Sequence, residues 1–142
     1  MGAWGTTAFQ SDAGLDFLGN MTVKSKSKDS IEKALEGVMC VSSFCSEVEA
    51  LAEIIANVYG KMECDEKIHM ESAIKCIEYL EEDKAYFNST LAKLHYALNI
   101  ISKLNDVLWK EELLEKRKLY IAELSNAIEA IIREIKEDGA NN

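Results

Sequence analysis

The sequence predicts an all-α protein, a single-domain bundle of about five helices with an extended N-terminal segment packed on it. Three observations support this fold class. The 142 residues include no proline, which removes the strongest helix breaker. No stretch shows the sustained alternation of apolar and polar residues that is typical of a half-buried strand. Apolar residues instead recur at spacings of three and four along most of the chain, as they do on one face of a helix.

Residues 1–11 are expected to be extended, because Gly2 and Gly5 permit tight backbone paths there. Ser11 is then expected to cap a short helix over residues 12–21. The polar residues 22–28, in which lysines alternate with serines, are predicted to be a linker. The whole chain, 1–142, is predicted to be one helical domain.

A second helix is expected from about residue 29, with a break or bend around residues 41–43. Ser46 and Glu49 have the spacing of a capping box, in which each side chain bonds the other residue's backbone amide. Apolar residues then recur at helical spacing until Gly60, which supplies a stop.

Three further helices account for the C-terminal half. Asp65 is expected to cap one that ends in the charged run 81–84. The next runs through apolar residues from Leu91 to Leu104, and the last is the longest, from about residue 109 to 137. Its apolar stripe is wider than the seam of a coiled coil, which favours packing within a bundle.

The charge balance excludes one class of partner. The chain has 25 acidic and 16 basic residues, a net charge of −9 spread along both halves. With a pI near 4.8 it would repel phosphate, so we expect no nucleic-acid binding. No window approaches the roughly 18 apolar residues that a membrane span requires, and no targeting segment is visible. We therefore expect no membrane association and a cytoplasmic location.

Motifs that would indicate catalysis are missing from the sequence. It contains no glycine-rich phosphate loop, no G-x-S-x-G and no H-E-x-x-H, so we expect no catalytic residues and no enzyme. The four cysteines lack the C-x2-C spacing of zinc sites, and we expect them to be buried thiols. Glu66 and His69 form only half of a di-iron motif. Neither a metal nor another cofactor is predicted, although a site assembled from Cys64, His69 and Cys76 is an alternative.

The first 18 residues, MGAWGTTAFQSDAGLDFL, resemble the start of the bacterial family called domain of unknown function 4259. Members of that family typically open with MGAWG, followed by a phenylalanine, an acidic or Asn-Asp pair and a Leu-Asp-Phe/Trp-Leu helix. Ala13 departs from this pattern, since an acid is common there, and similarity is weaker over residues 46–61 and 101–112. The resemblance implies no established activity. The matching residues are Trp4, Gly5, Phe9, Asp12, Asp16, Phe17 and Leu18.

Four of the matching residues are candidate binding residues: Trp4, Phe9, Asp12 and Asp16. One interpretation is structural, with the two aromatic side chains filling gaps between helices. The other is a site in which Asp12 and Asp16 present carboxylates beside aromatic walls, since their spacing of four puts both on one helical face. A carboxylate near a helix N-terminus also stabilises the helix dipole, which by itself would account for Asp12.

The favoured functional hypothesis is a non-enzymatic protein-interaction module, of the immunity or antitoxin kind, whose negative charge attracts a basic partner. One alternative is a small-ligand or metal-binding helical protein that uses Asp12, Asp16, His69 or the thiols. Another is a scaffold that forms homo-oligomers through its last helix.

Overall fold

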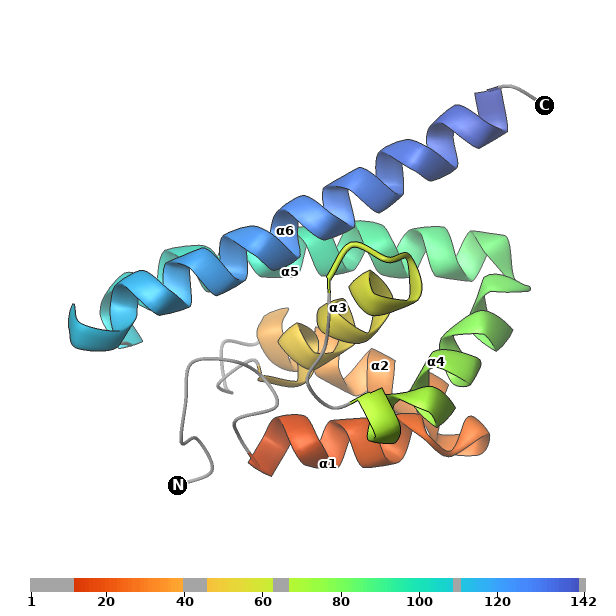
Figure 1. Cartoon of the computed structure of the whole chain (residues 1–142), viewed down its shortest axis with the longest axis horizontal. Coiled ribbons are helices and arrows are strands. Elements are labelled where there is room, and N and C mark those ends of the chain that lie inside the picture. The colour runs from red at the N-terminus through yellow and green to blue at the C-terminus, as the bar shows by residue number, and fades with distance from the viewer. Residues whose placement is uncertain (1–11, 40–45, 63–66, 109–110, 141–142) are drawn as a thin grey trace.

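All regular structure that is described in this protein is α-helical (Figure 1). The computed structural model describes residues 12–39, 46–62, 67–108 and 111–140. The predicted all-α class is therefore confirmed for these residues. They form six helices: α1 (Asp12–Met21), α2 (Lys24–Met39), α3 (Ser46–Val58), α4 (Lys67–Glu81), α5 (Lys84–Leu108) and α6 (Glu111–Ala140).

The helix count differs from the prediction at one place. The second predicted helix, with its expected break, is two separate helices, α2 and α3, and the residues between them lie outside the described ranges. Gly60 ends α3 as predicted, with a positive φ of 69° that glycine adopts without strain. Helix α4 ends in the charged run 81–84 as predicted, and α5 begins at Lys84. The Asp83 carboxylate caps α5, because it accepts a hydrogen bond of 3.2 Å from the Tyr86 amide.

The prediction of a linker over residues 22–28 is wrong from Lys24 onward, because α2 begins there. The amides of Lys26 and Ser27 donate to the Val23 carbonyl oxygen at 2.9 and 3.1 Å and so start the helix. Lysine has a high helix propensity, and serine lowers helix stability only slightly. Alternating lysines and serines therefore do not prevent α2 from starting at Lys24. Ser27 is also buried, which shows that tertiary packing holds this first turn in place.

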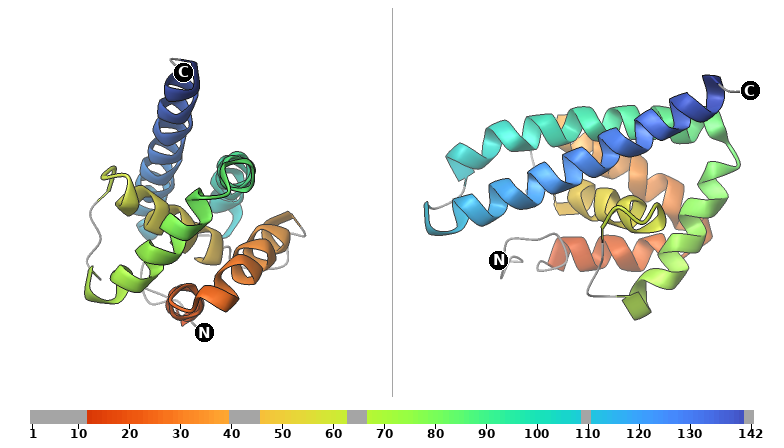
Figure 2. Two further views of the ribbon diagram at one scale, coloured as in Figure 1. Left: turned by 90° about the vertical axis from the view of Figure 1, so that its right-hand side faces the viewer. Right: turned by 45° about the horizontal axis from the view of Figure 1, so that its top comes forward.

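Helix α3 lies at the centre of the fold and packs against each of the other five helices (Figures 1 and 2). Its nine consecutive residues from Val48 to Ala56 are all buried. A helix that is apolar on every side is stable only when other elements cover it completely. The surrounding helices supply that cover, and buried apolar side chains from all six form one continuous core.

Helices α5 and α6 run antiparallel across one side of α3 (Figure 2). The 30 residues of α6 make a helix about 45 Å long. Within the described residues α6 packs only on α3 and α5, which leaves its outer face exposed. Leu119 on that face is 70% exposed. Long as α6 is, neither it nor any other described helix has the apolar length needed to span a membrane.

Candidate functional site

The four predicted binding residues are only partly within the described structure. Trp4 and Phe9 lie outside it, as does the whole of the predicted extended segment, residues 1–11. Asp12 is the first residue of α1, and Asp16 follows one turn later with an exposed side chain. A site that combines the aromatic residues with the two carboxylates therefore stays a prediction.

Asp16 does line a surface pocket of about 510 Å³ that is formed by α1, α2 and the first turn of α3. Its lining includes three carboxylates and two lysines, together with an amide and a hydroxyl. Asp29 and Lys33, one turn apart on α2, form a salt bridge of 3.1 Å in its lining. The pocket is polar and open to solvent, so it suits a charged group better than an apolar one. The lining residues are Asp16, Phe17, Asn20, Lys26, Asp29, Ser30, Lys33 and Glu47.

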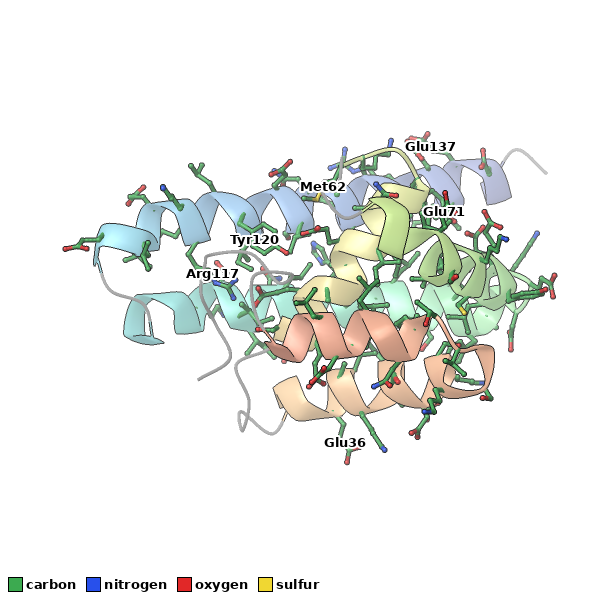
Figure 3. The ribbon with its side chains drawn as sticks, turned by 60° about the horizontal axis from the view of Figure 1, so that its bottom comes forward. Glu36, Met62, Glu71, Arg117, Tyr120 and Glu137 are labelled. Atoms are coloured by element: carbon green, nitrogen blue, oxygen red, sulfur yellow. The ribbon has the colours of Figure 1, made fainter. Side chains whose placement is uncertain are left out.

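A second cluster of charged side chains is buried between α3 and α6. Glu49 on α3 is completely buried, and both of its carboxylate oxygens accept hydrogen bonds from the guanidinium of Arg117 on α6. This two-bond arrangement is the strongest geometry for an arginine–carboxylate pair. Figure 3 shows Arg117 and Tyr120 extending from α6 toward the rest of the bundle.

A second buried hydrogen bond joins α3 to α6 one helical turn further along α3. Glu53, one turn after Glu49 on α3, accepts a hydrogen bond of 2.7 Å from the hydroxyl of Tyr120, and both side chains are buried. The guanidinium carbon of Arg117 lies 5.9 Å from the centre of the Tyr120 ring, within range of a cation–π contact. We call Glu49, Glu53, Arg117 and Tyr120 the α3–α6 network. It joins two helices that are 67 to 68 residues apart in the chain.

The environment of the α3–α6 network changes the acidity of Glu49. Burial raises the pKa of this carboxyl from its ordinary 4.5 to about 7, with a smaller contribution from the nearby Glu53. The hydrogen bonds and charge of Arg117 act in the opposite direction and limit the rise. The network contains two carboxylates and one guanidinium, so it can take up a proton near neutral pH. Its evident role is to fasten α6 to the central helix.

This network was not predicted from the sequence, in which Glu49 has the spacing of a capping box with Ser46. Helix α3 does begin at Ser46, but the Glu49 carboxylate bonds Arg117 instead. The sequence of α3 does contain a pattern that indicates buried charge. Glu49 and Glu53 are the only charged residues between Val48 and Ala56, and acids in a helix that is apolar on every side need buried partners. The sequence could not show that Arg117, one of two arginines in the chain, is the partner.

In the part of the chain that the structure describes, no three histidine, cysteine or acidic side chains are grouped so as to hold a metal ion. Cys76 is a buried thiol. Cys64, which the alternative metal site requires, lies outside the described residues.

Comparison with known proteins identifies a family and nothing further. The model of the family described as "Domain of unknown function (DUF4259)" matches residues 2–139 of the chain. No curated protein and no solved structure matches the sequence or the fold. The chain therefore belongs to the DUF4259 family, as its first 18 residues predicted.

Proposed function

We propose that this member of the DUF4259 family is a non-enzymatic protein-interaction module that binds a basic protein in the bacterial cytoplasm, in the manner of an immunity protein or an antitoxin. The observation that carries the proposal is the location of its negative charge. The α3–α6 network accounts for one of the nine excess negative charges of the sequence. Among the residues whose side chains the structure describes, only Glu49, Glu53 and Arg117 are buried charged residues, so the other described charges lie at an acidic surface. Such a surface steers a basic partner toward the protein.

Exposed aromatic side chains add contact area to this acidic surface. Tyr79 on α4 is 50% exposed and Tyr96 on α5 is 57% exposed. Tyrosine is enriched at protein interfaces because it combines a large apolar ring with a polar hydroxyl. Both residues stand on the outside of helices that the central core holds rigid, so a partner would meet a preformed surface.

A second candidate function, small-ligand binding, has one observation in its favour. The pocket that contains Asp16 has a volume of about 510 Å³, within the range of roughly 300–1,000 Å³ that is common for ligand sites. Its open, charged lining indicates a polar ligand. The two candidates differ in whether a free small molecule or a protein occupies the pocket.

Native co-purification followed by mass spectrometry tests the interaction proposal. We expect a basic protein that is recovered in a fixed ratio to this chain. Its association rate should fall steeply as salt is raised, because screening weakens the attraction between opposite charges. An unrelated basic protein of similar charge is the control, and equal binding to it would mean non-specific attraction. Recovery of the chain only as a monomer or homodimer would contradict the proposal.

A further inference from the structure

We infer that the pocket between α1, α2 and the first turn of α3 receives an arginine or lysine side chain of the basic partner. This inference rests on the proposed interaction function and assigns it a surface. It also gives Asp16, singled out by the sequence, a place in the interaction.

The pairing of charges around the pocket leaves it with unused negative charge. Asp29 is already paired with Lys33. Among the described residues, Asp16 and Glu47 have neither a hydrogen bond nor a salt bridge. These two carboxylates outnumber the remaining ammonium group, that of Lys26. A cationic side chain is therefore the group that the pocket attracts most strongly.

The positions of these carboxylates favour a side chain that bonds in several directions. Asp16 belongs to α1 and Glu47 to α3, so a group that enters between the helices finds acceptors on two sides. Asn20 and Ser30 supply further oxygen acceptors in the lining. Arginine has five N–H donors in one plane, and lysine has three on a flexible stem, and both can engage such a set.

Two other polar regions fit a basic side chain less well. The hollow beside Tyr79, of about 440 Å³, is lined only by α4 and the residue that follows it, so its carboxylates come from one side. The α3–α6 network is buried, and the Glu49 carboxylate there already accepts both bonds from Arg117. Of these three regions, the α1–α2–α3 pocket combines open access with carboxylates from separate helices.

An NMR titration with an acetylated, amidated tetra-arginine peptide tests the inference on the whole chain. We expect the largest backbone shifts in α1, in α2 and near Glu47. Replacing both carboxylates, Asp16→Asn with Glu47→Gln, should weaken peptide binding about tenfold, the sum of two exposed ion pairs. The matched control is Glu112→Gln with Glu123→Gln, which removes the same charge from the exposed face of α6. It should change the affinity less than twofold.

A charge-reversal variant of the same pocket should change the peptide affinity in the opposite direction. Lys26→Glu removes the remaining ammonium group and should tighten peptide binding. Its control is Lys116→Glu on α6, an exposed lysine with the same change in net charge. All six positions in the two pocket variants and their controls are exposed or half-buried, and circular dichroism of each variant confirms that it is folded.

The outcomes separate the inference from the proposed function. If the co-purified partner binds the Asp16→Asn, Glu47→Gln variant as tightly as the wild type, the inference is wrong and the interaction function stands. Pocket and control variants that weaken peptide binding equally would also overturn the inference. If free arginine binds the pocket as tightly as the peptide does, the site is one for a small ligand. Failure to recover any basic partner would overturn the proposed function itself.

Discussion

Replacing Arg117 by methionine removes the guanidinium that pairs with Glu49 and keeps an unbranched apolar side chain in the place of the arginine stem. Both residues are almost completely buried, and the substitution leaves a buried carboxylate without its two charge-assisted hydrogen bonds. Breaking such a pair costs about 3–5 kcal/mol, out of a total stability of roughly 5–15 kcal/mol for a domain. For a chain of this size the unfolding temperature should fall by about 10–20 °C.

Urea unfolding followed by circular dichroism measures this loss at pH 8, where Glu49 is ionised. At pH 5 the loss should be smaller, because a carboxyl whose pKa is about 7 is then neutral. Arg133→Met is the matched control, since Arg133 forms an exposed pair with Glu129 on the same helix. Replacing Glu49 and Arg117 together by leucine and methionine should recover most of the loss. Equal effects of Arg117→Met and Arg133→Met would refute the role assigned to the buried pair.

Three further predictions concern single positions. Because burial raises the pKa of Glu49 from 4.5 to about 7, its contribution to the free energy of unfolding is fully present below pH 4.5 and is lost as pH rises through about 7. The loss is about 3 kcal/mol, and Glu49→Gln should abolish this dependence in urea titrations across that range. Tyr120→Phe removes a hydrogen-bond donor from the buried Glu53 carboxylate and should cost about 2 kcal/mol in the same assay, whereas Tyr96→Phe at an exposed position should have little effect. Gly60→Ala should destabilise by about 1 kcal/mol because its φ is positive, while Gly19→Ala inside α1, with open space around the new methyl group, should raise the unfolding temperature. A stabilising Gly60→Ala substitution would contradict the first part of that pair.

Helix positions were predictable where local signals are strong. The apolar spacing of α3, the stop at Gly60 and the charged turn before α5 were all read correctly from the sequence. The start of α2 was not, because three lysines and two serines look like a solvated linker when their surroundings are unknown. Burial of Ser27 shows that contacts with other helices extend α2 past the point where local propensity would begin it.

The candidate site was less predictable than the fold. Asp16 was named from the sequence and does line a pocket, but its neighbours Lys26 and Glu47 come from other helices and were not anticipated. The same holds for Glu49 and Arg117, which are far apart in the chain. The residues around a buried charge in the sequence do not identify the distant residue with which it will pair.

The sequence by itself determined that this protein is helical, acidic and a member of the DUF4259 family, because periodicity, composition and an N-terminal motif are local or additive properties. The tertiary structure alone decided that α3 is the central helix and that its glutamates face α6. It also decided that Asp16 and Glu47 line one pocket. The physical reason is that each of these features depends on which helix faces cover one another, and a buried charge or a shared cavity exists only once they do.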